Sequence, residues 1–92
     1  MIIRFRHKGL ARFHLTGSVK GIQPAHATKL ARILALLEVA SSPLDLRVPS
    51  FEAHQLSGRY QAYWSLKVNA NWRVIFCFMG HDVDDVNYVD YH

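Results

Sequence analysis

The second half of the chain contains three runs of strand-forming residues separated by short connections. They cover residues 62–68, 72–79 and 86–91, and turns are predicted at residues 69–71 and 80–84. The first run alternates two kinds of side chain, Trp64, Leu66 and Val68 against Tyr63, Ser65 and Lys67. This period of two is typical of a half-buried strand. The second run is apolar throughout, which indicates a strand covered on both faces, and together the runs predict an antiparallel meander.

The first half of the chain is dominated by one helical pattern. Apolar residues recur every three or four positions after Pro24, which suits the first turn of a helix, and the pattern stops at residues 41–43. The stripe consists of Ala27, Leu30, Ile33, Leu34, Leu37 and Ala40. Shorter elements are predicted as a strand over residues 2–6, a helix or turn over 10–15, a loop over 17–21 and a strand over 51–56. Helices followed by an antiparallel meander define an α+β fold.

Length and composition fit one folded domain over residues 1–92. Half of the residues are apolar and a fifth are charged, which is usual for a chain with one hydrophobic core. Cys77 is the only cysteine, so no intramolecular disulfide can form, and a cytoplasmic protein is expected. The Cys77 thiol is expected to pack as a small apolar group. No apolar stretch is long enough for a signal peptide or a membrane span.

The charge balance is basic. Eleven Lys and Arg residues against seven Asp and Glu give a formal charge of +4. A basic surface attracts polyanions, of which nucleic acid is the most common in cells. The same surplus also serves plain solubility, so charge alone leaves an ordinary solvated surface as an alternative.

The motifs of common enzyme classes are absent from the sequence. There is no Gly-rich phosphate loop, no Cys/His zinc spacing and no Ser or Cys nucleophile in a recognisable setting. Histidine is frequent instead, with six in the chain. Four of them are expected to be solvated or to cap local structure, namely His7, His14, His26 and His81.

The other two histidines have neighbours that favour chemistry. His54 lies in a predicted strand, and His92 is preceded by Asp90 and Tyr91. In an extended strand Asp90 and His92 would share a face, so that the carboxylate could fix the tautomer of the imidazole. Two histidines can divide RNA cleavage between them, one taking the proton of the 2′-OH and the other protonating the leaving oxygen. Arg73 is the candidate cation for the phosphate, because its guanidinium matches phosphate geometry.

Each of these residues also has a simpler interpretation. A strand histidine is more often a surface residue than a catalyst, a terminal Asp-Tyr-His can be a frayed tail, and Arg73 can pair with a carboxylate. His54, Asp90 and His92 could also ligate a metal, which their spacing neither supports nor excludes. Three aromatic residues are expected in the core rather than on a base-stacking surface, namely Tyr63, Trp64 and Trp72.

The order of motifs along the chain resembles that of the HigB toxins in the RelE family. The matching segments are IRFRHKGL at residues 3–10, HQLSG at 54–58, YWSLKVNANWRVIF at 63–76 and NYVDYH at 87–92. They cover nearly the whole chain at about the expected spacing. The Val-x-x-x-Trp-Arg-Val step at residues 68–74, together with a terminal Asp-Tyr-His, makes the resemblance specific.

The resemblance implies a small, twisted antiparallel sheet with two N-terminal helices packed on one face. It implies a toxin of a type II toxin–antitoxin system that cuts messenger RNA in the A site of the 70S ribosome and leaves a cyclic phosphate. Neither a cofactor nor a metal is expected. The expected partner is a HigA-like helix-turn-helix antitoxin, through which alone the toxin would meet operator DNA. Carried over position by position, the catalytic residues are His54, Arg73, Asp90, Tyr91 and His92, with Tyr91 orienting or stacking on the nucleotide.

The chain departs from the family pattern in the loop after the first histidine. Relatives often carry a basic residue where this chain has Ser57, and Arg59 or Arg47 is expected to supply that charge. The basic side chains expected to contact RNA are Arg4, Arg6, Lys8, Arg59 and Lys67. The competing hypothesis is a catalytically silent module of the same fold that binds nucleic acid or antitoxin within a repressor complex. The enzyme is favoured because a silent relative has no chemical reason to keep the set His54, Arg73, Asp90 and His92.

Overall fold

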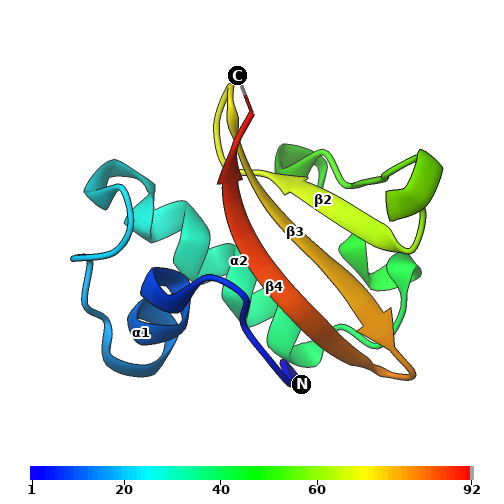
Figure 1. Ribbon diagram of the computed structural model, residues 1–92, viewed down its shortest axis with the longest axis horizontal. Helices are drawn as coiled ribbons and strands as arrows, with labels where there is room; N and C mark the ends of the chain where they lie inside the picture. Colours follow the sequence, from blue (N-terminus) through cyan, green and yellow to red (C-terminus); the bar gives the residue numbers. More distant parts are fainter. Residues whose placement is uncertain (92) are drawn as a thin grey trace.

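The computed structural model describes residues 1–91, which form two α-helices and one sheet (Figure 1). The helices are α1 (Lys8–Thr16) and α2 (Ala27–Val39), and the strands are β1 (His54–Gln55), β2 (Tyr63–Lys67), β3 (Trp72–Met79) and β4 (Asp82–Asp90). Short 3₁₀ turns, η1 to η4, lie at Pro24–His26, Pro43–Leu46, Pro49–Phe51 and Gly58–Tyr60. The strands pair antiparallel in the order β1-β2-β3-β4. The predicted α+β fold is therefore confirmed.

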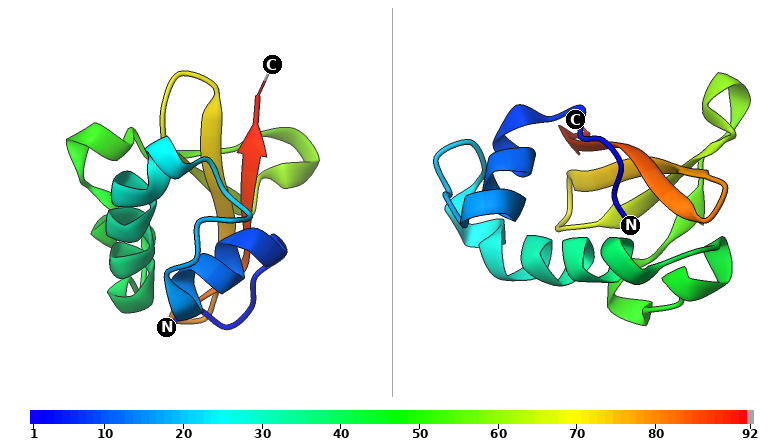
Figure 2. Two further views of the ribbon diagram at one scale, coloured as in Figure 1. Left: turned by 90° about the vertical axis from the view of Figure 1, so that its left-hand side faces the viewer. Right: turned by 90° about the horizontal axis from the view of Figure 1, so that it is seen from below.

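Helix α2 lies along one face of the sheet, and α1 lies beside the β4 edge (Figures 1 and 2). The predicted stripe of α2 supplies its buried side chains, Leu30, Ile33, Leu34 and Leu37. They pack into one cluster with buried strand residues, which include Leu66, Val74, Phe76, Val83 and Val86. No α-helix of residues 1–91 covers the opposite face, which we call the open face (Figure 2).

Strand β3 is not covered on both faces, contrary to the prediction from its apolar sequence. Val74 and Phe76 are fully buried toward α2, whereas Arg73, Ile75 and Cys77 are only half-buried on the open face. The apolar composition of β3 therefore supplies an apolar floor to the open face. None of the helices within residues 1–91 is long and apolar enough to cross a membrane.

Two predicted strands are shorter than expected. Residues 2–6 make only isolated parallel bridges to β4, Ile2 with Val83 and Phe5 with Val86, because β4 bulges between those partners, where Asp85 has a left-handed φ of 56°. The predicted strand 51–56 is reduced to β1, since Pro49–Phe51 forms a 3₁₀ turn and Glu52 has a left-handed φ of 44°. Strand β4 begins at Asp82, so the turn before it is shorter than predicted.

Candidate functional site

The register of the sheet decides which side chains share the open face. Directly paired residues on neighbouring strands point to the same face. Lys67 pairs with Arg73, which pairs with Val89. On β1, His54 pairs with Ser65, which lies two positions before Lys67 on β2 and so points to the same face. The sequence candidates His54, Lys67 and Arg73 therefore lie on one face of the sheet.

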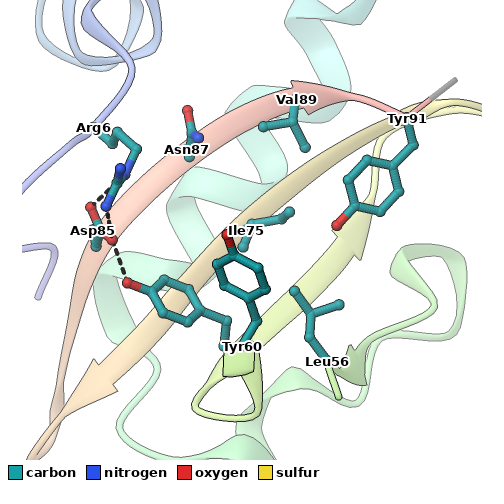
Figure 3. Close-up of a pocket in the computed structure, with 9 residues that line it drawn as sticks. Arg6, Leu56, Tyr60, Ile75, Asp85, Asn87, Val89 and Tyr91 are labelled. Atoms are coloured by element: carbon teal, nitrogen blue, oxygen red, sulfur yellow. Dashed lines mark hydrogen bonds and ion pairs between the residues drawn. The ribbon is translucent and has the colours of Figure 1, made fainter. Parts of the chain in front are cut away.

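A cavity of about 340 Å³ occupies the middle of the open face (Figure 3). Its lining combines apolar, aromatic and polar side chains, namely Arg6, Leu56, Tyr60, Tyr63, Ile75, Asp85, Asn87, Val89 and Tyr91. A largely apolar pocket with a few polar groups and three tyrosine rings suits a flat, hydrogen-bonding ligand such as a nucleobase.

One end of the cavity is closed by a charged cluster (Figure 3). The guanidinium of Arg6 donates two hydrogen bonds to the carboxylate of Asp85, at 3.0 and 2.8 Å. The hydroxyl of Tyr63 donates to the same carboxylate at 2.5 Å. This hydrogen bond raises the pKa of Tyr63 to about 12, and the Arg6 guanidinium holds the pKa of Asp85 below its ordinary value. Tyr63 is therefore a neutral donor at physiological pH.

Tyr91 lies at the other end of the cavity, next to the turn between β2 and β3. The backbone N–H of Tyr91 donates to the carbonyl of Asn71 at 2.7 Å. Nη1 of Arg73 donates to the carbonyls of Asn69 and Ala70, at 2.7 and 3.3 Å, and to that of Trp72 at 3.1 Å. Its Nη2 and Nε make no hydrogen bond to any residue in the range 1–91, so part of the guanidinium remains available to a phosphate.

His54 lies on the exposed edge strand of the same face. Its Nδ1 is 3.3 Å from the carbonyl oxygen of Glu52. A carbonyl can only accept, so this contact places the proton of the neutral ring on Nδ1 and leaves the lone pair on Nε2. The exposed Nε2 is therefore the atom that can exchange protons with a ligand on the open face.

Asp90 lies away from these residues. It pairs with Trp72, which alternates with Arg73, so its side chain is on the opposite face. Strands β1 and β4 are three strand spacings apart, which separates His54 from Asp90 by at least about 14 Å. The two cannot ligate one metal ion, and residues 1–91 contain no group of three His, Cys, Asp or Glu side chains that could hold one. His92 lies outside the described residues.

The predicted RNA-binding cations differ in how they are held. Arg6 lines the cavity but is paired with Asp85, and Arg4 contacts Asp84 at 3.2 Å. Lys67 forms an ion pair with Glu52, with Nζ 3.0 Å from the carboxylate oxygen. Lys8 is exposed in the first turn of α1.

Arg59 lies over the ring of Tyr60, with its guanidinium carbon 5.2 Å from the ring centroid. Because Tyr60 lines the cavity, Arg59 is at its rim, whereas Arg47 lines a separate groove next to Trp64. Of the two candidates for the charge missing at Ser57, Arg59 is therefore the one beside the cavity.

Some residues of this site were missed from the sequence. Tyr63 was expected in the core but lines the cavity, and its alternation with Trp64 and Leu66 was the available signal. Asn87 lines the centre of the cavity without having been singled out. Among the remaining histidines, His7 is confirmed as a cap, since its Nδ1 accepts from the backbone N–H of Leu10 at 2.9 Å. The expectation for His26 is wrong, because it is buried and only 8% exposed.

Comparison with known proteins identifies the family of the chain. The family described as "RelE-like toxin of type II toxin-antitoxin system HigB" matches residues 3–92. The chain belongs to the HigB-like toxin family. It is also 34% identical over 92 residues to the endoribonuclease HigB of Proteus vulgaris, and the match covers both chains completely. A HigB-like toxin of a type II system has an antitoxin as its partner.

Solved structures support the fold of this HigB-like toxin. It is similar to YafQ from E. coli strain BL21(DE3), with a TM-score of 0.65 at 15% identity over 98% of this chain and 91% of that one. It is also similar to a YoeB/ParE toxin from Agrobacterium tumefaciens, with a TM-score of 0.59 at 14% identity over 100% and 99% of the two chains. At these identities the likeness concerns the fold alone.

Proposed function

We propose that this HigB-like toxin is an endoribonuclease that cleaves messenger RNA in the A site of the ribosome, without a metal, and so inhibits translation. The observation that carries the proposal is the open face, which holds His54 and Arg73 together with a cavity lined by three tyrosines, Tyr91 among them. The full-length relative named endoribonuclease HigB supports the RNA-cleaving part of this proposal. A HigA-like helix-turn-helix antitoxin is proposed as the partner that holds the toxin inactive.

Proton transfer in this proposal begins at His54. Its Nε2 takes the proton of a ribose 2′-OH, and the 2′-oxygen attacks the adjacent phosphorus. The bond from phosphorus to the 5′-oxygen of the next nucleotide breaks, and His92 donates the proton that this oxygen needs. The products are a 2′,3′-cyclic phosphate and a free 5′-OH.

The remaining residues hold the substrate and stabilise its charge. Arg73 faces the negative charge that develops on the phosphate, through the part of its guanidinium that does not bind the turn. Tyr91 stacks on or orients the nucleotide. Asp90 lies on the opposite face. It therefore acts on the end of the chain and does not touch the substrate. A ribosome would supply the alignment of the RNA backbone, which can be worth about 7–11 kcal/mol.

Whether the reaction needs a metal is tested by treating the toxin with chelator before the assay. Chelator is kept out of the assay itself, because ribosomes need Mg²⁺. The toxin is treated with EDTA, desalted, and added to ribosomes that carry a defined messenger. An unchanged cleavage rate, with no gain on adding Zn²⁺ or Mn²⁺, is expected. A rate that falls on chelation and returns with one of these ions would overturn this part of the proposal.

The partner is tested in cells. Expression of the chain alone should stop growth, and co-expression of the gene directly downstream should restore it. A chain that leaves growth unaffected, while its message and protein are present, would favour the silent binding module instead.

A further inference from the structure

His26 is the buried end of a chain of contacts that reaches the open face. It lies in the 3₁₀ turn before α2 and is 8% exposed. Its ring packs edge-on against Trp72 of β3 and Tyr88 of β4, with centroids 5.6 and 6.0 Å apart. Both ring nitrogens have partners: Nδ1 is 2.6 Å from the hydroxyl of Tyr88, and Nε2 is 2.7 Å from the amide nitrogen of Asn69.

The side chain of Asn69 fixes the tautomer of His26. Its Oδ1 accepts from the backbone N–H groups of Asn71 and Trp72, at 3.3 and 3.2 Å. The group that faces His26 is therefore the NH₂ of the amide, which can only donate. Nε2 of His26 must accept, so the proton of the neutral ring sits on Nδ1 and is donated to Tyr88. Burial lowers the pKa of His26, which keeps this neutral form at physiological pH.

Asn69 begins the turn that holds two residues of the open face. Its carbonyl accepts the 2.7 Å hydrogen bond from Arg73, and the carbonyl of Asn71 accepts the 2.7 Å hydrogen bond from the N–H of Tyr91. A shift of this turn would move the guanidinium of Arg73 and the backbone of Tyr91 together. The contacts of His26 and Asn69 span 43 positions in the sequence, so they tie the turn to the start of α2.

We propose that His26 is a positioning residue for the RNA-cleaving site: through Asn69 it fixes the turn of residues 69–71, and the turn fixes Arg73 and Tyr91. The expected effect on cleavage rests on the proposed function, whereas the contacts from His26 to the turn do not depend on it. His26 touches no substrate in this arrangement, and its effect is carried by the backbone carbonyls of Asn69 and Asn71.

The tautomer is tested by nitrogen NMR of the histidine rings. In the parent protein the proton of His26 is expected on Nδ1. The Asn69→Asp variant keeps the Oδ1 acceptor of the turn but replaces the amide donor with a second acceptor. The proton of His26 should then move to Nε2, and the hydroxyl of Tyr88 should donate to Nδ1. A parent ring protonated on Nε2, or a tautomer that does not respond to Asn69→Asp, would overturn the contact chain.

Positioning is tested with two substitutions of His26. His26→Leu fills the buried space with an apolar side chain and removes both hydrogen bonds. His26→Gln can accept a hydrogen bond from Asn69 with its side-chain oxygen and donate one to Tyr88 with its side-chain nitrogen. His26→Leu should speed hydrogen exchange at the N–H of Tyr91. It should lower the maximal cleavage rate on saturating ribosomes by about 10–100-fold, with little change in the half-saturating ribosome concentration. His26→Gln should restore most of the rate.

The control is His81→Leu, because His81 is exposed in the turn before β4. It should leave exchange and rate unchanged. If His26→Leu cleaves at the parent rate, or if His26→Gln is as slow as His26→Leu, the positioning role is wrong. If the parent itself does not cleave RNA, the proposed function fails, and unchanged exchange at Tyr91 in His26→Leu would then also refute the positioning role.

Discussion

The backbone N–H of Tyr91 and the carbonyl of Asn71 form a 2.7 Å hydrogen bond that ties the end of β4 to the turn between β2 and β3. The side chain of Tyr91 remains 46% exposed at the rim of the cavity. The position of this residue is thus set by a backbone contact, while its ring stays available to a ligand.

Deleting Tyr91 and His92 should separate stability from activity. Among residues 1–91 the deletion removes one backbone hydrogen bond and an exposed ring, so the free energy of unfolding should fall by only about 1 kcal/mol. Cleavage should fall by about 10²–10⁴-fold, because an acid or base and a stacking ring are lost. Urea denaturation and cleavage assays on the same protein measure both. His92→Ala tests the proton donor alone, and a variant that melts normally and still cleaves would remove His92 from the mechanism.

His54→Ala should slow cleavage strongly without affecting the fold. His54 is exposed on the edge strand, so its loss should change stability by no more than about 0.5 kcal/mol. His81→Ala is the matched control, since His81 is also exposed but lies at the turn before β4. The maximal rate should fall by about 10²–10⁴-fold for His54→Ala and stay unchanged for His81→Ala. Equal activity of the two variants would mean that another group accepts the proton.

The main elements could be predicted because their signals are local. The stripe of α2 repeats at helical spacing, and the alternation of β2 places Leu66 and Val68 inward. The sheet order follows from short turns. The open face was harder to predict. An apolar sequence such as that of β3 does not reveal that helices cover only one face of the strand and that Ile75 lies on the other face.

The contacts that build the site are not local. His26 reaches Tyr88, 62 positions away, and Arg6 reaches Asp85, 79 positions away. The left-handed backbone of Asp85, which places its carboxylate beside Arg6 and Tyr63, has no signal such as glycine in the sequence. His54 and Arg73 were candidates because of their residue types and neighbours, and the role of Tyr91 came from the family resemblance. The sheet register was needed to place His54 and Arg73 on one face.

Arg59 should contribute to RNA binding, and Arg47 should not. Arg59 stacks on Tyr60 at the rim of the cavity, whereas Arg47 lines a separate groove. Arg59→Ala should weaken ribosome binding and lower the slope of log affinity against log salt by up to about 0.9. Binding measured at several salt concentrations tests this, with Arg47→Ala as the charge-matched control. A larger effect for Arg47→Ala would assign the missing loop charge to the other groove.

Stability should fall in two separate pH windows. Burial lowers the pKa values of His7 and His26 below 6.5, so the unfolded chain binds these protons first. The contribution of the two neutral histidines to the free energy of unfolding is present above about pH 6.5 and is lost as the pH falls below it. The pKa of Asp85 lies below 3.8 because of Arg6, so its contribution is lost only at still lower pH. Urea denaturation between pH 7.5 and 5 should show the first loss, and His26→Gln should reduce it. An identical pH dependence in both proteins would contradict the burial of a neutral His26.

The central claim is that the open face cleaves RNA when a ribosome presents it. The most direct measurement follows a 5′-labelled messenger in two settings, free in solution and on ribosomes with a chosen codon in a vacant A site. We expect a cut within that codon, ending in a 2′,3′-cyclic phosphate, only on the ribosome, and none with Arg73→Ala at equal protein concentration. Equal cutting of free RNA, or a cut that Arg73→Ala leaves unchanged, would contradict the account.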